Sequence, residues 1–198
     1  MAEAKVPSPP TDDLTEAGNA RLFVALHGLD LKFCHPEKAW YVWTGKRWEA
    51  DRSGSVLLRA KDVASVLYDL RNTPPELLKE ALAHARLSSK RKAIEAIPAL
   101  AASDLPVLPE AFDADPYCFH TEGRVYRLRP RTTDGDTGWY IESPHRDHMA
   151  TKMSPVEWLN PKDPPPCERY LRFLDEITNG DLELQGYLQR VAGYCLSG

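Results

Sequence analysis

Long apolar runs and paired cysteines are both missing from this 198-residue sequence. No apolar run approaches the roughly 20 residues that a membrane-spanning helix needs, and the N-terminus MAEAKVPSPP lacks the apolar segment of a secretory signal. The four cysteines lie far apart and never form a C-x-x-C pair, so no disulfide framework is expected. We therefore expect a cytoplasmic protein with no membrane partner and with reduced, buried or half-buried thiols.

Motifs for nucleotide and acyl chemistry are also missing. The sequence contains neither a G-x-x-x-x-G-K-[ST] phosphate loop nor a G-x-S-x-G nucleophile elbow. It therefore predicts no catalytic site in this chain and no bound metal or cofactor. A net charge of −4 gives no general argument for nucleic-acid binding, so any DNA contact has to come from a local basic patch.

Proline, by contrast, is abundant. The 17 prolines cluster at 7–10, 74–75 and 161–166, which predicts short elements separated by stiff connections. We expect an α+β fold, predominantly helical, with a small antiparallel sheet of hairpins and a C-terminal helix pair. The expected divisions are a disordered leader at 1–12, an α+β domain at 13–160, and a Pro-rich spacer with the helix pair at 161–198.

Helical periodicity is clearest near the two ends of the chain. Thr15 is a suitable N-cap for a helix over 16–27, although Gly18-Asn19 inside it lowers helix propensity by about 1 kcal/mol. We interpret that pair as serving close packing or an exposed polar contact. Near the C-terminus, Asn179-Gly180 separates two amphipathic helices and Asp181 is an N-cap for the second. Further helices are predicted over 55–70, from 74–75 to 85, and over 90–102 with Pro98 as a kink or an end.

The strongest strand signal lies around a hairpin. Gly45-Lys46 forms a two-residue loop that places Trp43 opposite Trp48. Further short strands are predicted at 31–34, 116–119, 124–129 and 138–142.

Three clusters of basic residues are candidates for DNA contact. One starts the helix at 90–102, one lies at the hairpin tip, and one follows the strand at 124–131, where alternation places Arg127, Arg129 and Arg131 on one face. Aromatic rings beside that face would let the bases of a single strand stack. The alternative interpretation is that these are solvated faces. The candidate residues are Lys46, Arg47, Lys90, Arg91, Lys92, Arg124, Tyr126, Arg127, Arg129, Arg131 and Trp139.

Histidine and aspartate clusters raise the question of a metal site. His145 and His148 form the only close histidine pair, with Asp147 between them, and Cys118 and His120 are conceivable further ligands. The alternative is a polar surface loop, which we prefer.

Asp113 and Asp115 have the D-x-D spacing found in sites for divalent metals. They stand in the sequence D-A-D-P, where aspartate side chains commonly accept hydrogen bonds from neighbouring backbone amides. We therefore interpret this segment as a turn.

Five segments, taken in order, resemble the region that precedes the helicase motor in phage and plasmid primase–helicases, a region shared with the poxvirus primase–helicase. The resemblance covers nearly the whole chain from residue 13. In place of the family's usual N-G-V-x-D-L-x-T-G, this sequence has EGRVYRL and then an inserted loop at 130–138. The matching segments are LTEAGNARLF at 14–23, WYVWTGKRWEAD at 40–51, FDADPY at 112–117, ATKMSPV at 150–156, and YLRFLDEITNGD to YLQRVAGYCLSG at 170–198.

The resemblance implies a parent protein that acts in DNA replication of a phage, prophage or plasmid in a bacterial host. Its motor would be a superfamily 3 AAA+ ATPase, which works as a hexameric ring, uses ATP and Mg²⁺, and unwinds DNA. In the family, the segment matching 193–198 leads into that motor, so we expect the helix pair to be the junction with a motor in cis. The expected interface residues are Tyr187, Leu188, Val191 and Tyr194.

Three functions follow as predictions. The leading one is a non-catalytic accessory domain that couples to the helicase motor and contacts single-stranded or forked DNA. The second is an oligomerisation or partner-docking module without DNA binding. The third, least favoured, is a metal-dependent nuclease that uses His145, Asp147 and His148.

Overall fold

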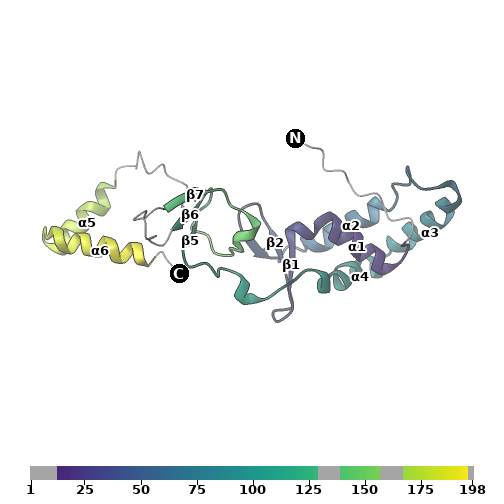
Figure 1. The fold of residues 1–198 in the computed structure, drawn as a ribbon, viewed down its shortest axis with the longest axis horizontal. Coiled ribbons are helices and arrows are strands. Elements are labelled where there is room, and N and C mark those ends of the chain that lie inside the picture. The colour runs from purple at the N-terminus through teal and green to yellow at the C-terminus, as the bar shows by residue number, and fades with distance from the viewer. Residues whose placement is uncertain (1–12, 129–138, 157–166, 196–198) are drawn as a thin grey trace, which may run out of the picture. The chain divides into compact units, whose positions relative to one another are not determined.

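The computed structural model describes residues 13–128, 139–156 and 167–195, and within them it has the predicted α+β fold (Figure 1). The helices are α1 (Glu16–His27), α2 (Ser55–Val66), α3 (Leu78–Ser88), α4 (Arg91–Ala101), α5 (Glu168–Thr178) and α6 (Leu182–Tyr194). The strands are β1 (Leu31–Cys34), β2 (Ala39–Trp43), β3 (Trp48–Ala50), β4 (Pro106–Val107), β5 (Cys118–His120), β6 (Val125–Leu128) and β7 (Trp139–Glu142). The predicted leader at 1–12, the loop at 130–138, the spacer at 161–166, residues 196–198, Arg129 and Arg131 lie outside the described residues.

The chain forms two compact units. The first runs to Ala111 without Gly45–Arg47, and the second combines those three residues with the chain from Phe112. The α+β domain predicted over 13–160 therefore spans the first unit and part of the second. None of the helices in the described ranges combines the length and apolar character needed to cross a bilayer.

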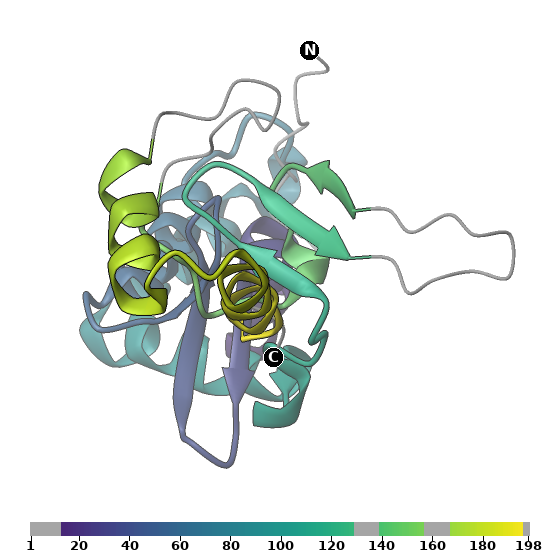
Figure 2. The ribbon, with the colours of Figure 1, turned by 90° about the vertical axis from the view of Figure 1, so that its left-hand side faces the viewer.

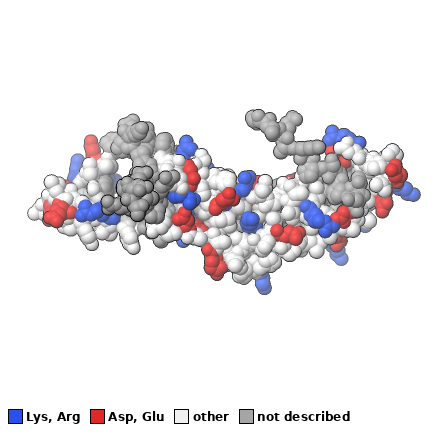
Figure 3. Space-filling model, in the orientation of Figure 1, with Lys and Arg blue, Asp and Glu red and all other residues white. Residues whose placement is uncertain are grey.

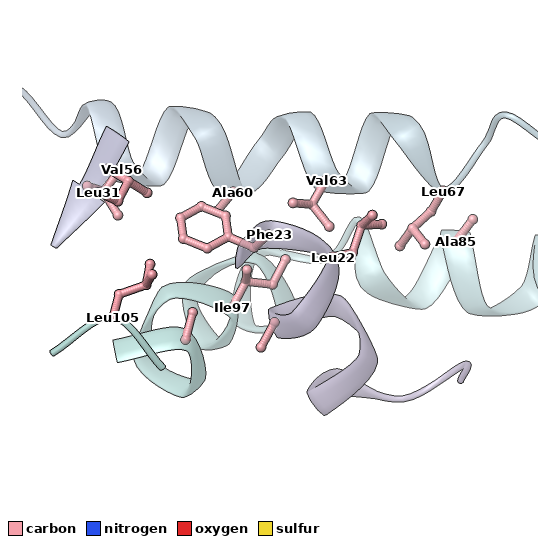
Figure 4. Close-up of a cluster of buried hydrophobic side chains, with 12 residues drawn as sticks. Leu22, Phe23, Leu31, Val56, Ala60, Val63, Leu67, Ala85, Ile97 and Leu105 are labelled. Carbon is pink, nitrogen blue, oxygen red and sulfur yellow. The ribbon is translucent and has the colours of Figure 1, made fainter. Parts of the chain in front are cut away.

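The first unit has a helical core closed by a sheet. Thr15 caps α1 by accepting a hydrogen bond from the Gly18 N–H at 2.9 Å, as predicted. Phe23 of α1, Val63 of α2 and Ile97 of α4 are almost completely buried and point toward one another (Figure 4). Pro98 does not end α4, because the helix runs on to Ala101 with residues on both sides of Pro98 buried in this core; the kink predicted at Pro98 stays a prediction.

The sheet of the first unit has the strand order β3-β2-β1-β4. Trp43 faces Trp48 across the hairpin, with ring centroids 5.8 Å apart, and Gly45 has φ +91°, so the predicted hairpin is confirmed. The prediction of purely antiparallel pairing misses β4, which pairs parallel with β1. A parallel neighbour requires a long crossover, and here α2, α3 and α4 supply it.

The described strands of the second unit form an antiparallel sheet in the order β5-β6-β7, with β6 and β7 side by side (Figures 1 and 2). A short 3₁₀ turn at Arg146–His148 follows. The helix pair α5–α6 is joined as predicted: Asn179 and Gly180 take φ of +51° and +79°, and the Asp181 carboxylate accepts hydrogen bonds from the N–H groups of Glu183 and Leu184.

All four cysteines are free thiols. Cys34 is buried and Cys118 is half-buried, as expected. The expectation is wrong for Cys167 and Cys195, which are exposed at the beginning of α5 and the end of α6. The reason is that the residues around them in the helix pair are themselves largely exposed.

Candidate nucleic-acid interface

Arg127, the central candidate on β6, is held between two carboxylates. Its Nη1 lies 3.0 Å from Asp115 Oδ2, and its Nε donates to Glu142 Oε1 on β7 at 3.0 Å. The same Glu142 oxygen lies 3.1 Å from His148 Nε2. A phosphate would have to displace these carboxylates to reach the guanidinium. The contacts that surround Arg127 therefore hold the sheet together, and its predicted contact with DNA remains a prediction.

The aromatic candidate Tyr126 does not lie beside Arg127. Neighbouring residues of a strand point to opposite faces of the sheet, so the expected cationic and aromatic combination is not formed by these two side chains. Tyr126 instead pairs with Phe119 of β5, with ring centroids 6.4 Å apart. Arg124 donates to Ser143 Oγ at 3.2 Å, and the backbone of Trp139 pairs with that of Leu128.

Lys90, Arg91 and Lys92 lie where α3 passes into α4. All three are exposed, as is Arg86 near the end of α3. Arg91 pairs with Glu95 within α4, Nε to Oε1 at 2.7 Å, whereas Lys90 and Lys92 take part in no ion pair among the described residues. No side chain caps the start of α4. The positive end of the helix dipole and two unpaired ammonium groups therefore meet at one exposed corner.

At the hairpin tip, Lys46 is paired. Its Nζ lies 3.1 Å from Glu122 Oε1, within the second unit, and both side chains are about half exposed. Positive and negative side chains are also interspersed over the face of the molecule shown in Figure 3. The corner formed by Arg86, Lys90 and Lys92, called the basic corner below, is accordingly the strongest of the candidates that the structure describes.

His120 and His148 lie together beside a hollow of about 540 Å³ in the second unit. Their ring centroids are 5.3 Å apart, and burial lowers the pKa of both imidazoles. His148 accepts a hydrogen bond from the His145 N–H on Nδ1 and therefore carries its proton on Nε2, facing Glu142. His145 in turn accepts from the Asp147 N–H. No three potential metal ligands come together in the described parts of the chain, and His145 and His148 cap the 3₁₀ turn between them.

The aspartate pair forms turns, as preferred, but Asp113 acts over a longer range than expected. Asp115 accepts from the Tyr117 N–H at 2.9 Å. Asp113 Oδ1 accepts from the N–H groups of Thr151 and Lys152 at 2.8 and 3.2 Å, and its other oxygen accepts from the Thr151 hydroxyl. Two of the matching sequence segments, 112–117 and 150–156, are thereby joined. Burial opposes ionisation of Asp113, but the hydrogen bonds outweigh it and hold its pKa below the ordinary value.

Replacing Asp113 by alanine is expected to destabilise the second unit by about 1–3 kcal/mol at neutral pH, because the half-buried N–H of Thr151 and the exposed N–H of Lys152 lose their acceptor. Because the pKa of Asp113 is lowered in the folded state, its carboxylate stabilises the fold fully at pH values above the ordinary pKa of 3.8. This stabilisation is lost as the pH falls through the folded-state pKa, so the difference in unfolding free energy between the variant and the natural protein should shrink in acid. Urea unfolding and amide exchange at Thr151 and Lys152 measure it. Asp104→Ala, at an exposed aspartate, is the control; equal effects of the two substitutions would contradict the role of Asp113.

Sequence inspection did not identify a buried polar cluster in the first unit. Asn19, only 1% exposed, donates to Ser88 Oγ at 2.8 Å, and its Oδ1 lies 2.9 Å from His84 Nε2. Ser88 contacts the same ring nitrogen at 3.2 Å, and it is 2% exposed. A catalytic serine triad needs an accessible serine and uses both ring nitrogens, so this cluster is structural. These hydrogen bonds explain why the helix contains Asn19. The polar contact is buried, whereas the sequence predicted an exposed polar contact.

Gly18 is explained by close packing. A Cβ on this residue would lie 2.1 Å from the Asp13 carbonyl oxygen, which no side chain tolerates. The only signal for both features in the sequence was the low helix propensity of Gly18-Asn19.

The predicted motor interface lies on the helix pair, where few side chains are buried. Tyr187, Val191 and Tyr194 are 56, 39 and 80% exposed, and Leu188 is half-buried. These residues form an apolar surface on α6.

A helical unit, a small antiparallel sheet and an exposed helix pair together define an α+β domain that presents surfaces for binding. Comparison with protein families identifies it more closely: the family described as D5 N terminal like matches residues 20–179. The chain belongs to this family, which is the N-terminal domain of primase–helicase proteins. Comparison with curated proteins gives no match.

Proposed function

We propose that this chain is a non-catalytic accessory domain of a replicative primase–helicase of a phage or plasmid in a bacterial host. Membership of the D5 N-terminal-like family is the observation that supports this proposal. The parent would carry a superfamily 3 AAA+ motor that acts as a hexameric ring and uses ATP and Mg²⁺. In this proposal the helix pair α5–α6 couples the domain to the motor.

The proposal includes contact with single-stranded or forked DNA through the basic corner. Lys90 and Lys92 are exposed cations without carboxylate partners among the described residues, and they flank the N–H groups that begin α4. Phosphates bind favourably where lysines and the N-terminus of a helix coincide. Arg127 offers less, because two carboxylates already match its charge.

Reversing both lysines of the basic corner, Lys90→Glu with Lys92→Glu, is expected to weaken binding of a single-stranded oligonucleotide at least about tenfold at low salt, since two phosphate contacts are lost. Fluorescence anisotropy across a salt series measures it, and the slope of log K against log salt should fall by about 1.5. Lys61→Glu with Lys79→Glu makes the same charge change at exposed lysines elsewhere and is the matched control. Equal losses of affinity in both double variants would show that binding depends only on the net charge of the chain and not on the basic corner. If the natural chain does not bind the oligonucleotide at all, the DNA role is refuted.

A second function, oligomerisation, is favoured by the exposed apolar residues of the helix pair. Nine of the nineteen large hydrophobic side chains that are exposed in the described residues belong to α5 and α6. Exposed apolar clusters of this kind mark interaction sites in soluble proteins. Oligomerisation does not require DNA contact, so it is tested separately from DNA binding. It is an alternative to motor coupling, because both would use Tyr187 and Val191 of α6.

A further inference from the structure

The helix pair carries one continuous apolar face. On each helix three exposed residues follow the spacing i, i+3, i+7, which places them on one stripe. Phe173 and Tyr187, at the middle of the two stripes, are 52 and 56% exposed. The residues of this face, called the helix-pair face, are Tyr170, Phe173, Ile177, Leu184, Tyr187 and Val191.

Both stripes lie on the same side of the hairpin. Leu174 and Thr178 of α5 are buried, and Thr178 accepts a hydrogen bond from Gln185 of α6, which identifies the sides on which the helices meet. At 100° per residue, the apolar stripe of α5 is centred roughly 90° from that contact side and the stripe of α6 roughly 130° from Gln185, both in the same rotational sense along the helix. Because the helices run in opposite directions, rotations in the same sense bring both stripes to one face.

The α6 helix has little within the hairpin to stabilise it. None of its residues is fully buried, and Gly186 and Gly193 each cost about 1 kcal/mol in helix propensity. Short helices in water depend on covering an apolar face rather than on propensity. A partner on the helix-pair face would supply that cover.

The charges along the outer edges of this face identify the partner. On α5, Arg169 and Glu176 stand seven residues, or about two turns, apart on one edge; on α6, Glu183 and Arg190 have the same separation on the other edge. None of these four takes part in an ion pair within the described part of the chain. An edge with opposite charges two turns apart is complementary to an antiparallel copy of itself.

The two edges share one symmetry axis. The midpoint of the first charge pair lies between Arg172 and Phe173, and that of the second lies between Gly186 and Tyr187. Each midpoint is seven residues from the centre of the turn, between Asn179 and Gly180, so both lie at the same height in the hairpin. A two-fold axis across the hairpin at this height places α5 antiparallel to its copy and α6 antiparallel to its copy, with all four charge pairs opposite in sign.

The alternative two-fold arrangement is disfavoured by the same residues. An axis parallel to the helices would place α5 of one copy over α6 of the other. Glu176 would then face Glu183, and Arg169 would face Arg190. Like charges in contact destabilise an interface, so the charge pattern selects the first arrangement.

From this pattern we infer that the helix-pair face binds the same face of a second copy of this chain, forming an antiparallel four-helix bundle with Phe173 and Tyr187 next to its two-fold axis. Isologous pairing of this kind is the commonest symmetry of soluble oligomers. The inference rests on the oligomerisation function proposed above and names its partner and geometry.

Charge reversal on the full 198-residue chain tests it, with sedimentation equilibrium as the measurement. Arg169→Glu alone and Glu176→Arg alone each place two like-charged pairs in the dimer. Each should raise the dissociation constant of the dimer about tenfold. The double variant restores opposite charges and should return the constant to within about twofold of the original. Glu168→Arg makes the same charge change as the second variant at an exposed residue on the side of α5 opposite to the helix-pair face, and it should have no effect.

Two results would overturn the inference. A chain that stays monomeric up to about 1 mM would overturn both the antiparallel dimer and the oligomerisation function. A dimer that responds equally to the single and double reversals, or as strongly to Glu168→Arg, would overturn the proposed geometry while leaving oligomerisation in place. Because neither result bears on Lys90 or Lys92, binding to single-stranded DNA would stand or fall separately.

Discussion

Replacing Arg127 by methionine is expected to lower the free energy of unfolding of the second unit by about 2–3 kcal/mol. The substitution leaves Asp115 and Glu142 without their shared cation, and unpaired half-buried carboxylates are more costly than the pair is favourable. The value is set below that of a fully buried pair because the Arg127 side chain is 30% exposed. Hydrogen exchange of the β5, β6 and β7 backbone, with urea unfolding, measures it.

Arg124→Met provides the matched control for Arg127, because it removes the same group from the edge of the same strand. Arg124 donates to the Ser143 hydroxyl in an exposed hydrogen bond, so the loss of this bond is expected to cost less than about 1 kcal/mol. The two arginines also separate structure from DNA contact. Loss of oligonucleotide binding in Arg127→Met with unchanged exchange rates would show that Arg127 binds DNA and does not hold the sheet.

Replacing Asn19 by leucine is expected to destabilise the first unit by about 2–3 kcal/mol. The amide joins α1 to α3 through Ser88 and His84, and an isosteric apolar group would leave the buried Ser88 and the half-buried His84 without this hydrogen-bond partner. Chemical denaturation followed by circular dichroism reports the loss of helix.

A double-mutant cycle with Ser88→Ala tests whether the Asn19 contact itself carries the effect. Ser88→Ala alone should cost about 1 kcal/mol, and the double variant should cost less than the sum by a similar amount, because the two residues share one hydrogen bond. Additive effects would show that Asn19 stabilises the unit by packing alone.

Local rules predicted the elements whose determinants are close in sequence. The Thr15 cap, the Trp43 and Trp48 pair and the turn at Asn179-Gly180 all depend on residues a few positions apart, and all three are confirmed. The family was also predictable, because its matching segments are short and in order.

The features that sequence analysis missed depend on distant partners. Asn19 bonds to Ser88, 69 residues away, and Arg127 lies between Asp115 and Glu142, which belong to different segments. Strand alternation correctly separates the faces of β6, yet it cannot show which carboxylates the fold brings beside an arginine. The strongest candidate for DNA contact is therefore the basic corner and not the arginine strand. The sequence identifies the cations of this corner, but it does not show that Lys90 and Lys92 lack carboxylate partners among the described residues.

The bonds between Asp113 and residues 151–152 close a loop of 38 residues that contains β5, β6 and β7. A disulfide across such a loop would stabilise by restricting the unfolded chain, and only reduction would open it. A carboxylate closes the same loop reversibly and without a redox requirement, so a single protonation weakens its hydrogen bonds to both backbone donors. The acid resistance of the whole three-stranded sheet is thus set in part by one side chain that lies outside every strand of that sheet.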